Sequence, residues 1–188
     1  MKIVISSYRP EWKTLFRKES EMLQQQLSEW NPIIEHIGST AVEGLAAKAI
    51  FDIMIGLPDE KCFPEIVPQI ISMNYLYVKK YESILPERRF FIKLKEPFSY
   101  PEKIIEPDGE IPDIEKYVRT YHLHVIRHGS TFWNRHIAFR DHLRTNLEDL
   151  KQYDALKRHL SEREWQNSNE FADAKEAFIR AIEKKIGY

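Results

Sequence analysis

The chain has 188 residues, of which 43% are hydrophobic and 30% are charged, and its formal net charge is −1. These values are typical of a folded globular domain, and the near-neutral charge gives no overall electrostatic basis for binding nucleic acid or a membrane surface. No apolar run reaches the roughly 18 residues that span a bilayer. A single cysteine, Cys62, excludes an intrachain disulfide, and no signal-peptide pattern opens the chain, so we expect a cytoplasmic protein.

Apolar periodicity and turn residues predict the elements in chain order. The first is a helix over 10–30 whose apolar face includes Trp12, Leu15 and Met22. Strands are expected over 33–37 and 49–56, and the second is almost entirely apolar, as is typical of a strand inside a sheet. The remaining expected elements are a helix over 61–73, strands over 75–79, 89–95 and 121–127, and helices over 131–145, 147–162 and 168–186.

The segment 96–120 interrupts this pattern with four prolines and with seven acidic residues against three basic ones. A connection of this length is either a solvated insertion or a functional lid, and both interpretations stay open. The order of helix, mixed strands and then helices predicts one α+β domain over 1–188. We expect residues 1–128 to form a mixed β-sheet flanked by helices and residues 129–188 to form a C-terminal helical annex.

A Gly-Ser turn and an acid on the following strand are the first candidate site residues. Gly38 and Ser39 directly follow the first strand, and Asp52 lies within the apolar second strand. The backbone N–H groups and the hydroxyl of such a turn can bind a phosphate. A buried carboxylate is costly unless it is paired or bound to a metal, so the apolar run favours Asp52 as a catalytic residue and metal ligand. The alternative is a solvent-exposed acid at a strand end.

Three histidines extend this candidate site. His122 and His124 lie two residues apart on a later strand and therefore share a face. They could ligate a metal together with Asp52, or His122 could act as a catalytic acid or base, and His36 beside the Gly-Ser turn could join them as a ligand. The alternative is that all three are hydrogen-bonded structural histidines. Strand alternation also places Met54 on the face of Asp52, where a two-metal site would need a second carboxylate.

Basic residues in the C-terminal helices predict an anion-binding site. Arg140 and Arg144 are one helical turn apart and could grip one anion together. Lys157 and Lys175 each interrupt an apolar helical stripe, so each must extend to solvent, pair with an acid or bind a ligand. Arg88 and Arg89, at the start of a strand, could contribute further cations, and the alternative is that they form a charged sheet edge.

Taken together, the motifs His36-Ile37-Gly38-Ser39-Thr40, Asp52-Ile53, His122 and Phe139-Arg140-Asp141-His142-Leu143-Arg144 resemble those of the GrpB family over nearly the whole chain. That family is grouped with the nucleotidyltransferase fold, a small mixed sheet flanked by helices. In active members of this superfamily the Gly-Ser turn holds a triphosphate and three acids bind metal ions. The resemblance therefore implies that Gly38 and Ser39 bind the ligand, that Asp52 is the first acid, and that the cofactor is Mg²⁺ or another divalent metal.

The sequence departs from the superfamily pattern at the other two acids. Met54 stands in the place of the second acid, and the later strand offers histidines, so the resemblance implies a fold more strongly than an activity. Two classes of function follow. The first is binding of a nucleotide or phosphorylated small molecule through the Gly-Ser turn, Arg140, Arg144 and Lys157. The second is a metal-dependent nucleotidyltransferase acting on a small-molecule acceptor. Neither class involves nucleic acid or a membrane, and both leave the oligomeric state open.

Overall fold

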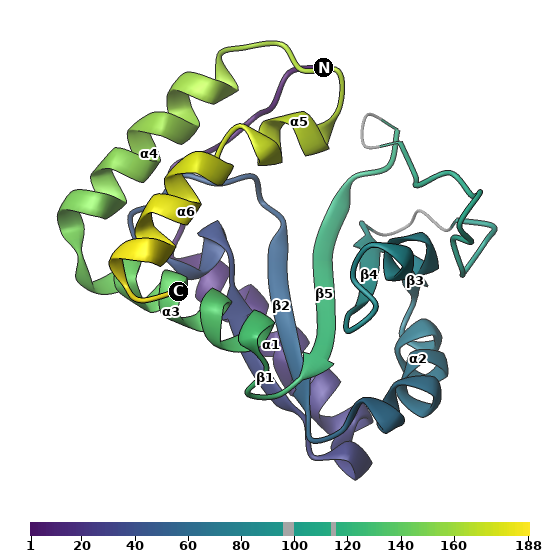
Figure 1. Ribbon diagram of the computed structural model, residues 1–188. Coiled ribbons are helices and arrows are strands. Elements are labelled where there is room, and N and C mark those ends of the chain that lie inside the picture. The colour runs from purple at the N-terminus through teal and green to yellow at the C-terminus, as the bar shows by residue number, and fades with distance from the viewer. Residues whose placement is uncertain (96–99, 114–115) are drawn as a thin grey trace.

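The computed structural model describes residues 1–95, 100–113 and 116–188. A five-stranded mixed sheet in the order β1-β2-β5-β4-β3 crosses the molecule (Figure 1). β2 and β5 run parallel, and the other neighbours pair antiparallel. The strands are β1 (Ile33–Ile37), β2 (Phe51–Leu57), β3 (Tyr75–Tyr77), β4 (Arg89–Leu94) and β5 (Arg119–Arg127). The predicted α+β class, a mixed sheet flanked by helices, is confirmed.

One face of the sheet is covered by α1 (Glu11–Gln26) and α2 (Phe63–Ser72). Leu23 of α1 and Ile66 of α2 pack there against strand residues such as Ile53, forming the main core. The predicted apolar face of α1 is only partly buried, since Leu15 and Met22 are 40% and 41% exposed. The helix also ends four residues earlier than predicted, and a separate 3-10 turn follows it. The 3-10 turns of the chain are η1 (Ser28–Trp30), η2 (Ser39–Ala41), η3 (Glu60–Cys62) and η4 (Lys79–Ser83).

The opposite face carries the C-terminal helices. α3 (Thr131–Thr145), whose bounds match the prediction, packs through Trp133 on Met54 of β2 and Ile126 of β5. α4 (Leu147–Ser161) and α6 (Glu176–Lys185) lie together beyond β1 and β2, and the short α5 (Ser168–Asp173) approaches the upper end of the sheet (Figure 1). The single helix predicted over 168–186 is therefore two helices, divided at Ala174 and Lys175.

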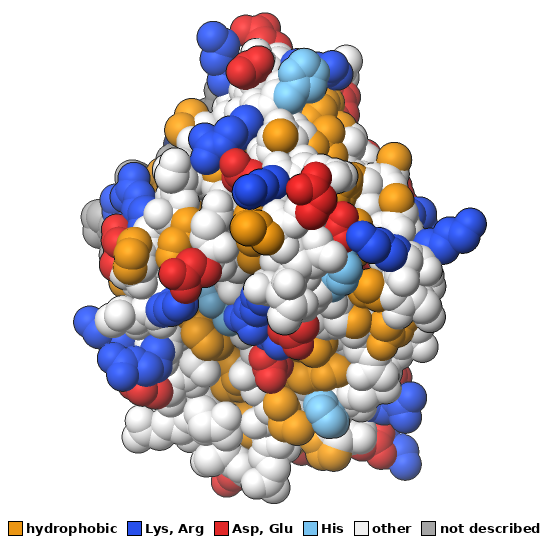
Figure 2. Space-filling view, turned by 90° about the vertical axis from the view of Figure 1, so that its left-hand side faces the viewer, with side chains coloured by type: hydrophobic (Ala, Val, Ile, Leu, Met, Phe, Trp, Pro, Cys, Tyr) orange, Lys and Arg blue, Asp and Glu red, His pale blue; other side chains and the backbone are white. Residues whose placement is uncertain are grey.

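The irregular segment predicted over 96–120 lies partly outside the described residues. Within its described part, Ile105 is 2% exposed and packs against Leu76 and Phe90, and Ile104 bridges to Tyr77. Its last two residues, 119 and 120, already belong to β5. Across the described residues no helix combines the length and apolarity that a bilayer crossing requires. Acidic and basic side chains are intermixed on the face seen in Figure 2, without a continuous basic surface there.

Candidate functional site

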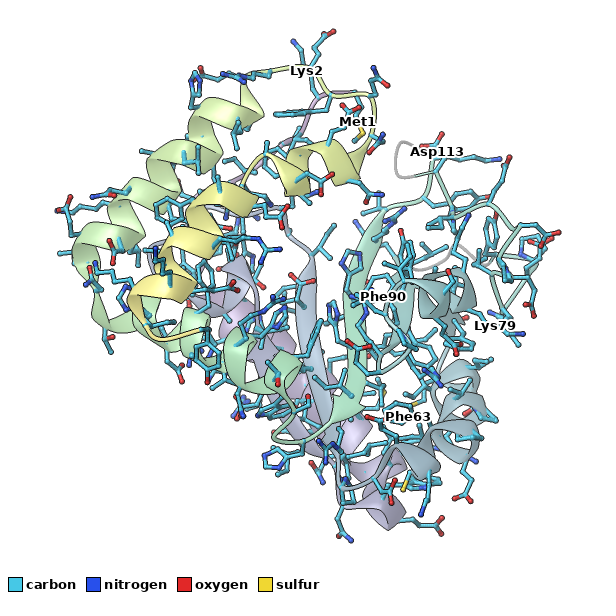
Figure 3. The ribbon with its side chains drawn as sticks, in the orientation of Figure 1. Met1, Lys2, Phe63, Lys79, Phe90 and Asp113 are labelled. Atoms are coloured by element: carbon cyan, nitrogen blue, oxygen red, sulfur yellow. The ribbon has the colours of Figure 1, made fainter. Side chains whose placement is uncertain are left out.

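Asp52, His122 and His124 meet on the sheet face that α3 covers. Asp52 is the register partner of His122 in the parallel β2–β5 pair, so their side chains point to the same side. Asp52 Oδ1 lies 3.2 Å from His122 Nδ1 and 3.8 Å from His124 Nε2. The carboxylate thus sits between two imidazole rings, and Phe90 of β4, marked in Figure 3, packs against both rings.

Burial and hydrogen bonds within the cluster set the protonation of Asp52 and His124. Burial alone would raise the pKa of Asp52, but the ring N–H groups of His122 and His124 outweigh burial and lower that pKa, so the carboxylate is ionised. Burial lowers the pKa of His124, whose Nδ1 accepts from Arg88 at 3.3 Å. A neutral His122 that donates Nδ1–H to Asp52 keeps an unprotonated Nε2, and this buried atom has no partner among the described residues.

The Gly-Ser turn is in close contact with the side chain of Asp52. Gly38 has a φ of +70°, and a Cβ added at Gly38 would lie 2.3 Å from Asp52 Oδ2 and 3.0 Å from its Cγ. Only glycine allows both this backbone conformation and this close approach. Ser39, the next residue, borders the cavity that opens above Asp52.

That cavity, which we call the basic cleft, has a volume of about 570 Å³ and lies between the sheet and the α5–α6 segment. Five cationic side chains line it, against the two carboxylates of Asp52 and Asp173. The cations are Lys48, Arg88, Arg119, Lys157 and Lys175. Because Asp52 is already paired with histidines, the cleft holds an excess of positive charge that suits an anion.

The three lysines of the basic cleft are held on apolar or backbone partners. Lys48 and Lys175 lie over the ring of Phe171, at 5.3 and 4.4 Å from its centroid. Burial, followed by repulsion from Lys175, lowers the pKa of Lys157 to about 7. Burial, followed by repulsion from Lys48, lowers the pKa of Lys175 to about 8. An anion in the cleft would offset this repulsion and favour the charged lysines.

Helix α4 fixes the connection between η2 and β2 through hydrogen bonds to both backbone polar groups of Ala46. The Ala46 N–H donates to Asp154 Oδ1 at 2.7 Å, and the Ala46 carbonyl accepts from Lys157 Nζ. Ala46 is fully buried. This clamp places Lys48, two residues further on, at the edge of the basic cleft.

The prediction that His36 joins the histidine cluster is wrong. His36 is the register partner of Ile53, so its side chain points to the α1 face, away from Asp52. Its ring stacks on Phe16 with 4.3 Å between centroids, and its Nε2 lies 2.9 Å from Thr40 Oγ1. Burial lowers the pKa of His36 to about 4, as is typical of a neutral structural histidine.

The expectation that Arg140 and Arg144 grip one ligand anion is also corrected. Arg140 is 7% exposed and donates to Glu35, to Asp141 and to the carbonyl of His36. Arg144 donates to the carbonyl of Ala41 at 2.9 and 3.1 Å. Arg140 therefore ties α3 to β1, and Arg144 ties α3 to the 3-10 turn that follows Gly38. Lys157, which was predicted to share their anion site, lines the basic cleft without them.

The donor set does not fit the implied divalent metal. Met54, at the position of a second acid, is fully buried against Trp133. Among the residues described, no group of three or more His, Cys, Asp or Glu side chains is arranged so that it could hold a metal ion. The basic cleft surrounds Asp52 with cations, which disfavour binding of Mg²⁺.

Two cations of the basic cleft were not predicted as site residues. Lys48 precedes the apolar strand and carries no periodic signal of its own. Arg119 contributes only to the charge of the 96–120 segment in the sequence analysis. The register between β4 and β5 shifts after the Lys93–Tyr121 pair, so that Leu94 pairs with Arg119. This bulge turns Arg119 toward the cleft.

Comparison with known proteins gives matches along the whole chain. The family model described as GrpB protein matches residues 2–185. The Glutamate-rich protein GrpB of Alkalihalophilus pseudofirmus is 29% identical over 185 residues, which cover 96% of this chain and 93% of that protein. A UPF0157 protein of Streptomyces coelicolor is 29% identical over 187 residues, covering 100% and 86% of the two chains. The crystal structure of the conserved protein GrpB from Enterococcus faecalis aligns with a TM-score of 0.75 and 30% identity, over 97% of this chain and 96% of that chain.

Proposed function

This chain belongs to the GrpB family, and from the chemistry of its basic cleft we propose that it binds a phosphorylated small molecule, such as a nucleotide, beside the Gly38–Ser39 turn. The observation that carries the proposal is a set of buried nitrogen atoms without a partner among the described residues. Arg88 Nε and Arg119 Nε are two of them, and the side chains of both residues line the cleft. Phosphate oxygens would accept from these donors, whose burial without a partner is otherwise costly.

The size and charge of the basic cleft support the same ligand class. A volume of about 570 Å³ lies within the range of small-molecule sites. Guanidinium groups suit the paired oxygens of a phosphate, while ammonium groups supply further charge.

We expect methyl phosphate to bind the wild-type protein more tightly at pH 7 than at pH 9. The ligand keeps its double charge over this range, since the second pKa of a phosphate monoester is about 6. Lys157 and Lys175, with pKa values of about 7 and 8, lose their protons as the pH rises, so attraction for the anion falls. Titration followed by protein NMR measures the two dissociation constants.

The variant Lys175→Met separates the proposed site from general charge. It should weaken methyl phosphate binding at pH 7 by about tenfold, the scale of one charge-assisted contact. Lys184→Met removes the same charge from an exposed position on α6 and should leave affinity unchanged. Equal effects of the two substitutions, or no binding by the wild-type protein, would contradict the proposal.

A second candidate function is favoured by the Asp52–His122 pair. Asp52 orients His122 so that the unpartnered Nε2 can accept a proton, as a general base does. In a nucleotidyl transfer, the acceptor oxygen would attack the α-phosphorus of a nucleoside triphosphate while its proton passes to His122 Nε2. The bond from phosphorus to the bridging oxygen would break, and pyrophosphate would leave with that oxygen.

For this second candidate we expect slow release of pyrophosphate from ATP, with water as the acceptor, and its loss in His122→Asn. The amide nitrogen of asparagine reproduces the donor to Asp52 but supplies no base at the Nε2 position. Phosphorus NMR of the reaction mixture measures the product. Release at the same rate by the variant would rule out His122 as the base, and no release by the wild-type protein would leave the binding function alone.

A further inference from the structure

A second cavity continues the basic cleft along the C-terminal helices. Its volume is about 750 Å³, and it lies between α3, α4 and α6. The two cavities share Ser39, the Ile84–Leu85 corner that precedes β4, and Ala172–Asp173 at the end of α5. The two cavities are therefore neighbours with a common boundary at these residues.

The second cavity differs in chemistry from the basic cleft. Half of its lining residues are apolar, and they include the rings of Phe139 and Tyr153, which meet edge to face at 5.7 Å. The positive charges of its arginines are compensated by neighbouring carboxylates of the protein. Arg180 lies 2.6 Å from Glu176, and Arg135 lies 3.3 Å from Glu183. No excess charge comparable to that of the basic cleft remains for a ligand to neutralise.

One hydrogen-bond donor at the second cavity is unused. Arg135 Nε is buried and lies 3.3 Å from Glu183 Oε1, an ion-pair contact, but it makes no hydrogen bond among the described residues. An acceptor atom on an otherwise apolar ring system would satisfy this donor. The combination of aromatic walls and a single donor is typical of a pocket that orients an uncharged planar group.

We propose that the second cavity binds an uncharged aromatic portion of the same ligand whose phosphate occupies the basic cleft. The substrate class is thus an amphiphilic phosphate ester, with its charge near Lys175 and its ring near Phe139 and Tyr153. This inference rests on the proposed phosphate-binding function and extends it to the rest of the ligand. Ile84 borders both cavities, and its side chain is 73% exposed. It would pack on the bound ring.

The test compares two esters with the same charged group, methyl phosphate and 1-naphthyl phosphate. We expect the wild-type protein to bind 1-naphthyl phosphate about tenfold or more tightly, because the ring buries apolar surface that the methyl group lacks. Calorimetry and NMR titration give the two dissociation constants. Equal affinities for the two esters overturn this inference alone, whereas no binding of either ester also overturns the phosphate-binding function.

Substitutions on α6 locate the ring. Ile179 lines the second cavity and is not part of the basic cleft, so Ile179→Glu should abolish most of the naphthyl preference while methyl phosphate still binds. Ala181→Glu adds the same charge at an exposed position of the same helix and is the matched control. If both substitutions reduce the preference equally, the ring binds elsewhere and the inference is wrong. A melting curve of each variant confirms that the fold is retained.

Discussion

Gly38→Ala is expected to lower the free energy of unfolding by about 3 kcal/mol or more and to abolish phosphate binding. The new Cβ would overlap Asp52 Oδ2 at 2.3 Å, and it would also lie 3.1 Å from Asp52 Cβ, so rotation of the carboxylate alone does not remove the overlap. Asp52 would have to leave His122, which would then lose the partner that orients its ring. Chemical denaturation measures the stability, and NMR titration with methyl phosphate measures the binding.

Gly129→Ala is the matched control for this prediction. Gly129 has a φ of +72°, almost identical to that of Gly38, but nothing lies within 4 Å of the position of an added Cβ. Its substitution should therefore cost only the backbone strain, about 1 kcal/mol. A similar loss of stability for the two variants would mean that the contact with Asp52 contributes nothing, contrary to our interpretation of the turn.

Met54→Asp is expected to destabilise the protein by about 4 kcal/mol or more. Met54 is fully buried among Ile37, Ile126 and Trp133, so the new carboxylate would be unpaired and out of contact with water. Met54→Leu conserves volume and polarity and should cost less than about 1.5 kcal/mol. Thermal and chemical unfolding compare the three proteins.

The Met54→Asp variant also tests our conclusion about the metal. If the sheet face of Asp52 were a metal site that lacks one acidic ligand, an acid at position 54 would restore this ligand. Mg²⁺ would then bind more tightly and stabilise the variant. We expect no gain in Mg²⁺ affinity by calorimetry, because the position is packed beneath Trp133. A stable variant with tight Mg²⁺ binding would overturn our description of this face.

Local sequence patterns were sufficient for most of the fold. β1 and α3 have the predicted bounds, because a turn or a cap limits each of them. Gly38 ends β1, and the side chain of Ser130 accepts from the N–H of Trp133 at the start of α3. The division between α5 and α6 had no such signal, since Ala174 and Lys175 are neither glycine nor proline and keep nearly helical backbone angles.

The site could be predicted only where it depends on alternation within one strand. His122 and His124 share a face because they lie two residues apart on β5, whereas Asp52 joins that face through the parallel register of β2 and β5. The placement of His36 depends on the register between β1 and β2. This register cannot be inferred from the sequence of either short strand alone. The roles of Arg140 and Arg144 depend on acceptors more than 100 residues away, such as the carbonyl groups of His36 and Ala41. Periodicity identifies a cation on a helix, but it does not identify the cation's partner.

The two hydrogen bonds from α4 to the backbone of Ala46 bear on the order of folding. The two partners of Ala46 lie 108 and 111 residues further along the chain, so each contact closes a very long loop. During synthesis at about 5–20 residues per second, roughly 5–20 s separate the appearance of Ala46 from that of Lys157. The sheet edge formed by β1 and β2 can pair in that interval, since its contacts are local. The basic cleft can therefore be complete only after α4 and the later α5–α6 segment, which carries Phe171 and Lys175, have docked on the sheet.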